Sequence, residues 1–371
     1  MATAEKQGRE LLASAGVTVG GSEAHDIQVH DGRFWARVLK DRELGLGEAY
    51  QDGWWDVERV DEFLVRVFTA DLRAAVRPSP ALLWNAARAR LTNRQTNSRA
   101  AQNASAHYDI GNDLYVRMLG EEMIYSCAVW DEALDLAAAQ EAKLDLICRK
   151  LHLEPGMRVL DIGCGWGGFA RHAAAGYGVH VVGISPAGEQ VREARQRAGD
   201  LSVEFHQQDY RDVTGTYDRI VSIGMFEHVG PRNYPGFFDR CGDLLTPDGL
   251  MLHHTIGSNE SKESTDAWFD RYIFPGGVIP SLHQIAGAAQ PRWSIEDVHN
   301  LGPDYDRTLM TWFERIEARW DEIPEYDDRF RRTWRYYLLS SAASFRVRNL
   351  QLFQVVFSRT GRVSPTYRGV R

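Results

Sequence analysis

The sequence predicts an α/β fold in which a parallel β-sheet is flanked by crossover helices. The first observation behind this prediction is that five short apolar segments alternate with helical stretches in the second part of the chain. The second is a glycine turn that directly follows the first of these segments and leads into a helix. The expected strands cover residues 158–162, 179–183, 202–205, 218–223 and 249–254.

The glycine turn lies in residues 159–168, which read Val-Leu-Asp-Ile-Gly-Cys-Gly-Trp-Gly-Gly. Glycines let a backbone approach a ligand closely, and the free N–H groups at the start of the next helix face that ligand. The pattern is typical of Rossmann-like nucleotide-binding folds. A turn of this kind also has a purely structural interpretation, because many α/β proteins need one simply to fold.

The residues around the turn favour S-adenosylmethionine over a nicotinamide dinucleotide. A dinucleotide fold expects an acidic residue roughly 20 positions after the glycines, where it binds the ribose. The second expected strand leads instead into Gly183, Ile184 and Ser185. Asp161 precedes the first glycine, where a carboxylate can bind the amino group of a cationic ligand or nearby waters. We therefore predict a methyl donor as the ligand.

Polar residues after the second and third strands are further candidates for donor binding, because ligands of open α/β sheets bind at the strand ends. Gln190 is suited to bond ribose hydroxyls, and Asp209 to accept from an adenine amino group. Each has a structural alternative. Gln190 can be an ordinary exposed helix residue, and Asp209 can cap the turn that follows it.

Glu227 and His228 follow the fourth strand, and His254 ends the fifth. A Glu and a His on neighbouring strand ends can relay a proton or hold a small anion or a water. His253 and His254 alternate faces, so at most one of them faces the ligand, and either can equally be a core histidine. Cys127, Glu227 and His254 lack the spacing of metal ligands, so we expect no metal.

Composition and charge exclude several classes of protein. A net charge of −8 argues against nucleic acid as the main partner. The four cysteines are far apart and form no CxxC pair, which disfavours a disulfide framework and a zinc site and favours a reducing cytoplasm. No segment approaches the roughly 18 uninterrupted apolar residues that span a bilayer, and the N-terminus lacks the apolar core of a secretory signal. We expect a soluble, cytoplasmic protein.

Residues 1–100 are expected to form a small α+β domain, and residues 101–371 the α/β domain. In the first of these, the alternation in residues 26–35 predicts two strands around a tight turn. Trp54 and Trp55 follow another turn and are expected to be exposed. Residues 93–105 are polar and read as a linker.

Residues 66–99 carry seven arginines and a single acid, Asp71, interleaved with apolar side chains. Basic and apolar residues at helical spacing can form a surface helix that rests on anionic lipid headgroups. The alternative is a solvated helix face packed on its own domain.

Together these motifs resemble those of the cyclopropane-fatty-acyl-phospholipid synthases and their mycolic acid cyclopropane synthase relatives. Residues 44–55 also resemble the extra N-terminal domain of the bacterial phospholipid-acting synthases. The resemblance covers nearly the whole chain. It rests on residues 107–114, 124–128, 159–168, 208–212, 218–222, 225–230, 254–257, 272–276, 304–306 and 351–358.

The resemblance implies a Rossmann-like S-adenosylmethionine-dependent methyltransferase fold with a small α+β N-terminal domain. It implies methylene transfer to the cis double bond of unsaturated phospholipid acyl chains, in which the alkene takes the donor's methyl group and loss of a proton closes a cyclopropane. Bound bicarbonate would serve as the general base beside the cationic intermediate. The alternative is a fatty acid methyltransferase of the same fold that gives methyl-branched or methylene acyl chains. A third, non-catalytic lipid-binding role is disfavoured by the intact glycine turn and anion residues.

The same resemblance assigns roles to individual residues. Cys127, Glu227, His254 and Tyr305 would be catalytic and would hold bicarbonate together with the backbone of Ile256. Ser185 departs from the threonine that is usual at its place. The resemblance further implies association with the inner face of the membrane and is compatible with a homodimer. The expected donor-binding residues are Tyr125, Ser126, Asp161, Gly163, Gly165, Gly167, Ser185, Gln190, Asp209 and Tyr210.

Overall fold

The computed structural model of the chain describes residues 2–70, 72, 110–361 and 367–371. Its contacts divide the chain into two compact units, which are described separately. The first comprises residues 1–92, 264–275 and 309–350. The second comprises residues 93–263, 276–308 and 351–371.

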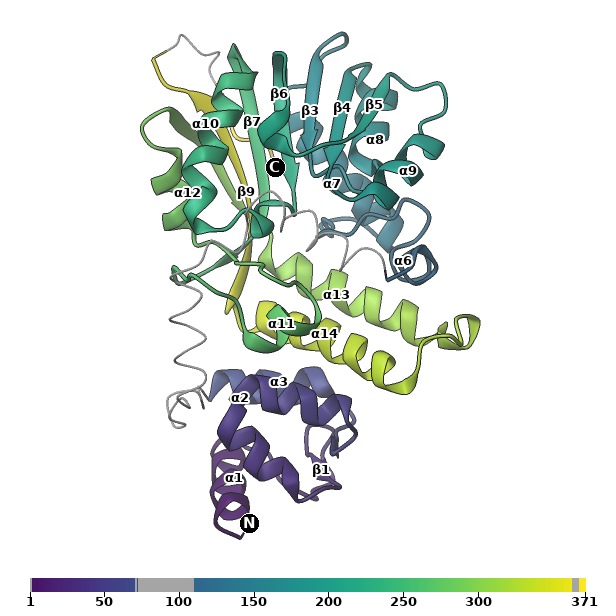
Figure 1. Cartoon of the computed structure of the whole chain (residues 1–371), viewed down its shortest axis with the longest axis vertical. Coiled ribbons are helices and arrows are strands. Elements are labelled where there is room, and N and C mark those ends of the chain that lie inside the picture. The colour runs from purple at the N-terminus through teal and green to yellow at the C-terminus, as the bar shows by residue number, and fades with distance from the viewer. Residues whose placement is uncertain (1, 71, 73–109, 362–366) are drawn as a thin grey trace. The chain divides into compact units, whose positions relative to one another are not determined.

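The second unit is built on a seven-stranded sheet with the order β5-β4-β3-β6-β7-β9-β8 (Figure 1). The pairs β5–β4, β4–β3, β3–β6 and β6–β7 are parallel, whereas β8 is antiparallel to β9. This confirms the predicted α/β sheet and all five predicted strands. The strands are β3 (Arg158–Ile162), β4 (His180–Ser185), β5 (Val203–Gln207), β6 (Tyr217–Ile223), β7 (Leu245–Ser258), β8 (Trp293–Asn300) and β9 (Leu350–Arg359).

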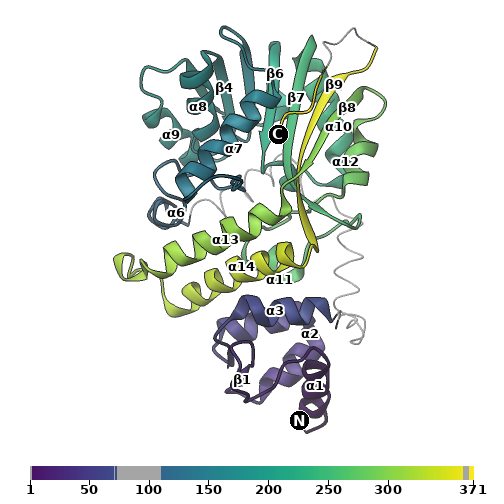
Figure 2. The same ribbon diagram turned by 180° about the vertical axis from the view of Figure 1, so that it is seen from behind.

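Helices cover both faces of this sheet, because successive strand residues point to opposite faces and both sets are apolar. Val159 and Val181 pack in the core cluster beneath α7, α8 and α9. Leu160 and Val182, one residue further along, pack in the cluster beneath α10 and α12. Figures 1 and 2 show the two groups of helices on opposite sides of the sheet. The helices are α7 (Leu136–Lys150), α8 (Gly168–Tyr177), α9 (Gly188–Arg197), α10 (Tyr234–Leu244) and α12 (Leu282–Ala289).

Side-chain caps begin two of these helices. The Asp135 carboxylate accepts a hydrogen bond from the Ala138 N–H at 2.9 Å and caps α7. Ser281 and Gln284 form a reciprocal capping box at the start of α12. Further elements that lie wholly or partly in this unit are α6 (Asn112–Leu119), α13 (Gly302–Glu317) and the 3₁₀ turns η1 (Tyr210–Asp212), η2 (Phe226–His228) and η3 (Pro231–Asn233).

The first unit is mainly helical, with one short two-stranded ladder. The contacts α14·α3 and α14·α2 bring a C-terminal helix against two N-terminal ones within the unit. Its elements are α1 (Ala2–Ser14), β1 (Gln28–Val29), α2 (Arg33–Gln51), β2 (Trp55–Asp56), α3 (Val60–Thr69), α11 (Ala267–Tyr272), η4 (Trp320–Glu322) and α14 (Asp328–Arg346).

Two local predictions for the N-terminal segment are wrong. Residues 26–35 contain one short strand, which pairs with Trp55–Asp56, and the expected second strand is instead the start of α2. Trp55 is completely buried, because its ring packs against Tyr50 and Phe63, each at 5.1 Å between ring centroids. Each strand of this ladder has only two residues, and the helix α2 separates the two strands in the chain. Such short strands leave no periodic pattern in the sequence.

The basic segment 66–99 and the linker 93–105 lie mostly outside the described residues. Within the described part, α3 ends at Thr69. The headgroup-binding hypothesis and a domain boundary near residue 100 therefore stay predictions. No helix of the described residues combines the length and apolar character needed to cross a bilayer.

Candidate active site

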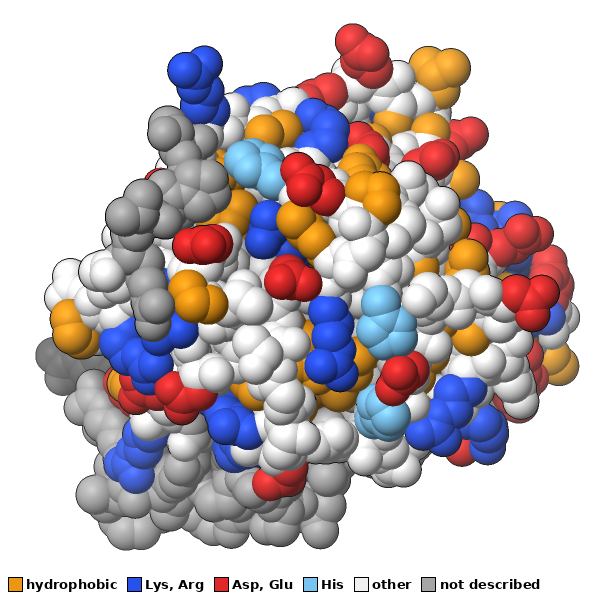
Figure 3. Space-filling model, turned by 90° about the horizontal axis from the view of Figure 1, so that it is seen from above, with side chains coloured by type: hydrophobic (Ala, Val, Ile, Leu, Met, Phe, Trp, Pro, Cys, Tyr) orange, Lys and Arg blue, Asp and Glu red, His pale blue; other side chains and the backbone are white. Residues whose placement is uncertain are grey.

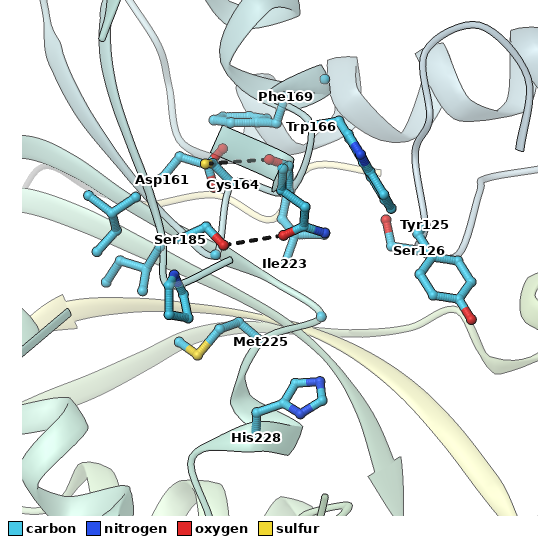
Figure 4. A pocket seen from close by; sticks show the side chains of 18 of the residues that line it. Tyr125, Ser126, Asp161, Cys164, Trp166, Phe169, Ser185, Ile223, Met225 and His228 are labelled. Carbon is cyan, nitrogen blue, oxygen red and sulfur yellow. Dashed lines mark hydrogen bonds between the residues drawn. The ribbon is translucent and has the colours of Figure 1, made fainter. Parts of the chain in front are cut away.

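A pocket lies at the carboxyl ends of the parallel strands in the second unit (Figure 4). The strands β3, β4 and β6 reach it, as does the chain segment before α7. Gly167 was predicted to bind the donor but is not among the lining residues. The other predicted donor-binding residues line the pocket: Tyr125, Ser126, Asp161, Gly163, Gly165, Ser185, Gln190, Asp209 and Tyr210.

The glycine turn gives the pocket its backbone wall. Gly163 has a φ of +84°, and a Cβ atom there would lie 2.7 Å from the Cβ of Met225. Gly167 has a φ of +80°, and a Cβ atom there would lie 2.6 Å from the Cζ of Phe205. Both positions therefore require glycine for conformation and for space. Gly167 supports the turn by allowing close packing at the start of α8.

Asp161 is the penultimate residue of β3 and lines the pocket (Figure 4). Its side chain is buried, and its Oδ2 atom has no hydrogen-bond partner within the described part of the chain. Burial raises the pKa of Asp161 to about 7, and the nearby Lys143 opposes that rise. A cationic group in the pocket would stabilise the ionised carboxylate.

Ser185 and Gln190 form one hydrogen-bonded pair at the end of β4. The Ser185 hydroxyl donates to the Gln190 Oε1 at 3.2 Å (Figure 4). Both side chains are buried, so the interpretation of Gln190 as an ordinary exposed residue is wrong. Ser185 Oγ also accepts from the Ala187 N–H at 3.2 Å. The pair fixes the turn between β4 and α9.

Asp209 caps the turn that follows it and also lines the pocket. Its carboxylate accepts from the Arg211 N–H and from the Arg211 guanidinium, each at 3.0 Å. It therefore caps η1, as the structural alternative required. It also lines the pocket next to Tyr210. Binding of an adenine amino group stays a prediction.

A second group of polar side chains gathers around the next strand pair, β6 and β7. Glu227 lies in η2, and its Oε1 atom accepts from the Ile256 N–H at 2.7 Å. Its Oε2 atom is buried and has no hydrogen-bond partner among the residues described. Burial raises the pKa of Glu227, whereas the hydrogen bond from Ile256 lowers it.

His254 lies on β7 and is completely surrounded by protein. Its Nδ1 atom lies 3.3 Å from the Nε2 amide of Gln354 on β9, and its Nε2 atom has no partner in the described structure. Burial lowers the pKa of His254 well below its usual range, so the ring is neutral. His253 points to the opposite face and packs edge-on against Phe226 at 4.3 Å between ring centroids, as the alternation predicted.

Cys127 and Tyr305 come from two further segments. The Cys127 thiol is buried, and it donates to the carbonyls of Ala128 at 3.2 Å and Leu301 at 3.8 Å. Burial raises the pKa of this thiol, so it is protonated. Leu301 precedes α13, whose first turn carries Tyr305, a buried residue. Cys127 also follows Ser126, which lines the donor pocket.

The family of the chain follows from comparison with known proteins. A family model described as mycolic acid cyclopropane synthetase matches residues 95–355. The chain belongs to this family. It is accordingly an S-adenosylmethionine-dependent methyltransferase of the cyclopropane synthase type, with the α/β fold that was predicted.

Two relatives of known activity match almost all of the chain, and two solved structures match about 70% of it. It is 49% identical to the cyclopropane-fatty-acyl-phospholipid synthase of Escherichia coli, over 94% of this chain and 92% of that protein. It is 33% identical to the tuberculostearic acid methyltransferase UfaA1 of Mycobacterium tuberculosis, over 95% and 88%. Among solved structures, the cyclopropane synthase MmaA2 of M. tuberculosis matches with a TM-score of 0.66 and 30% identity, over 72% and 99%. The cyclopropane synthase CmaA1, solved with S-adenosylhomocysteine, matches with a TM-score of 0.65 and 32% identity, over 70% and 98%.

Two buried polar residues of this family member were missed from the sequence. Gln354 stands in the middle of an apolar run on β9, where only its polarity marks it. Lys143 stands on the apolar face of α7, four residues after Ala139 and four before Ile147, and it lines the donor pocket. A charged residue inside an apolar helical stripe is the signal that could have found it.

Proposed function

We propose that this protein transfers a methylene group from S-adenosylmethionine to the cis double bond of unsaturated phospholipid acyl chains and so forms cyclopropane fatty acids. The observation that carries the proposal is a pair of buried polar atoms without partners among the described residues, Glu227 Oε2 in the turn after β6 and His254 Nε2 on the neighbouring strand β7. Unpaired buried polar atoms each cost roughly 1–3 kcal/mol, so a site that keeps two of them is suited to a small polar ligand.

The polar atoms at this place fit bicarbonate. Glu227 Oε2 can accept from the hydroxyl group of the anion, while the Tyr305 hydroxyl can donate to its oxygens. The Cys127 thiol can donate to the anion by turning its single hydrogen away from the carbonyls of Ala128 and Leu301. The Gln354 amide donates to His254 Nδ1, which leaves the ring proton on Nε2 as a further donor. Ile256 donates to Glu227 itself, and we propose that its backbone orients the carboxylate.

The role of the described residues in the rest of the reaction is to bind and orient the donor and the bicarbonate. S-adenosylmethionine supplies the methyl group, and bicarbonate, when bound, supplies a base and a negative charge in a site that excludes water. Asp161 faces the donor with a carboxylate, and the Ser185–Gln190 pair is suited to its ribose. The buried His254 and Cys127 remain neutral, so they donate hydrogen bonds without adding charge.

We further propose that the enzyme acts at the inner face of the membrane as a peripheral protein. On the face drawn in Figure 3, the coloured acidic and basic side chains are interspersed. Our candidate for headgroup contact is the basic segment 66–99, because it carries seven arginines and a single acid. Sedimentation with anionic vesicles should weaken as salt rises, and binding that is unaffected by salt would contradict an electrostatic contact.

Product analysis tests the proposed reaction. The protein is incubated with labelled S-adenosylmethionine and unsaturated phospholipid vesicles, and the fatty acid methyl esters are identified by mass and by remaining unsaturation. A product one CH₂ heavier without a double bond supports the proposal. Methyl-branched or methylene products would establish the second candidate, which the similarity to UfaA1 favours. The absence of any label transfer would overturn both.

A further inference from the structure

Helix α7 carries two lysines whose side chains are buried, and they differ in their partners. Lys150 is 0% exposed, and its Nζ atom lies 3.1 Å from the Asp297 carboxylate and 3.1 Å from His299 Nδ1. Lys143 is 1% exposed, and its Nζ atom donates to the Ser126 hydroxyl at 3.0 Å. Within the described residues Lys143 makes no salt bridge, so its charge lacks the compensation that Lys150 has.

Lys143 lies where the donor pocket meets the proposed anion site. Its partner Ser126 lines the pocket and is followed directly in the chain by Cys127. Lys143 itself lines the pocket and is close enough to Asp161 to influence its pKa. An ammonium group has three N–H donors, and Ser126 takes one of them.

We propose that Lys143 is a positioning residue whose ammonium group binds a small oxyanion at the junction of the two sites. This inference rests on the proposed function, which brings two oxyanions to this place. One is the bicarbonate held by Cys127 and Glu227, and the other is the carboxylate at the amino-acid end of the donor. Bicarbonate is the one we expect, because Cys127 follows the Lys143 partner Ser126 in the chain and is near enough to Lys143 for their charges to interact.

Electrostatics distinguish this role from simple packing. Both the sulfonium and the amino group of S-adenosylmethionine are cations, so a buried lysine beside them opposes their binding. The same lysine favours an oxyanion. Replacing a residue that only supports the fold would lower the affinities for S-adenosylmethionine and for the oxyanion together. Replacing Lys143 should change these two affinities differently.

The protonation of Lys143 gives a second readout. Burial lowers its pKa to about 8, and this effect is only partly offset by nearby groups. Loss of the charge above that pH should weaken the bound oxyanion. The titratable groups whose charges interact with Lys143 are Cys148 on α7 itself and, from other elements, Cys127, Asp161, His172 and His254.

The test uses the full-length protein with Lys143→Met, which keeps an unbranched side chain and removes only the terminal charged group. Activity is measured in carbon dioxide-depleted buffer against added bicarbonate, and calorimetry gives the affinities for S-adenosylhomocysteine and for methylthioadenosine, which lacks the carboxylate. We expect the half-activating bicarbonate concentration to rise at least tenfold while both nucleosides bind as well as before. A tenfold loss for S-adenosylhomocysteine alone would identify the donor carboxylate as the oxyanion.

Two controls keep the result interpretable. Lys150→Met removes the other buried lysine of α7 and should leave the bicarbonate requirement within twofold. Ser126→Ala, which removes the acceptor of Lys143, should shift the requirement in the same direction as Lys143→Met. An unchanged requirement and unchanged affinities in Lys143→Met, or equal losses for both nucleosides, would overturn the inference. A wild-type enzyme that is indifferent to bicarbonate would instead overturn the proposed base, and the nucleoside comparison would still test Lys143.

Discussion

The donor pocket and the proposed anion site lie at neighbouring strand ends, but the chain builds them in different ways. The donor pocket is shaped largely by backbone, from a glycine turn within residues 159–168. The anion site collects single side chains from four separate segments, at Cys127, Glu227, His254 and Tyr305. The first site should therefore depend on space and conformation, and the second on individual polar atoms.

The two sites also differ in what they cost the folded state. The glycines of the turn adopt left-handed conformations without strain, because they have no Cβ atom. Around the anion site, by contrast, Glu227 Oε2 and His254 Nε2 are buried without partners among the described residues, where Lys143 is likewise buried without a salt bridge. Desolvated polar groups of this kind weaken stability and are kept where a ligand or a reaction needs them.

Glu227→Gln should have the largest effect on turnover. The amide keeps the shape of the side chain and can still accept from the Ile256 N–H, but it removes the carboxylate charge at Oε2. We expect kcat to fall by about 10³-fold, as for the loss of a key electrostatic group in an active site. Label transfer measures kcat, and S-adenosylhomocysteine affinity should be unchanged because the donor pocket is intact. Wild-type turnover would show that Glu227 is no part of an anion site.

Gly167→Ala tests the other side of the comparison. A left-handed φ costs an L-residue roughly 1–2 kcal/mol, and the close approach to Phe205 adds a similar overpacking penalty. We expect a loss of about 3 kcal/mol in the free energy of unfolding, measured with urea. The control is Gly165→Ala, because a Cβ atom at Gly165 would meet nothing within 4 Å. Equal losses in the two variants would mean that packing against Phe205 does not matter.

The pH dependence of the free energy of unfolding should reveal how much the burial of the charged Lys143 destabilises the fold. Its folded pKa of about 8 lies below the 10.5 of an ordinary lysine, so the unfolded chain binds more protons between these values. Stability therefore rises with pH across this window. Relative to Lys143→Met, the wild-type protein should gain about 2 kcal/mol between pH 7.5 and 9.5. A constant difference between the two would show that Lys143 is not a buried cation.

The same contrast explains which residues could be predicted from the sequence. Asp161 and the glycines around it form one contiguous run, so the fold and the glycine wall of the donor pocket could be predicted from local pattern, whereas Tyr125 and Ser126 came from the resemblance. The roles of Cys127 and Tyr305 came only from resemblance, because folding brings distant segments together and leaves no local pattern. Lys143 and Gln354 were missed because each stands alone in an apolar pattern that otherwise signals packing.

Gln354→Leu should have the smallest of these effects, and it tests whether the anion site depends on orientation as well as on its ligands. The Gln354 amide lies 3.3 Å from His254 Nδ1, where it sets the tautomer that leaves a proton on Nε2. Without this amide, both tautomers become available, and we expect kcat to fall about tenfold with donor affinity unchanged. Gln351→Leu is the matched control on the same strand, since Gln351 pairs with Asn300 at 2.8 Å and should change kcat by less than twofold. Equal effects of the two substitutions would mean that packing alone holds His254 in place. The anion site would then depend on space and conformation, as the donor pocket does, rather than on individual polar atoms.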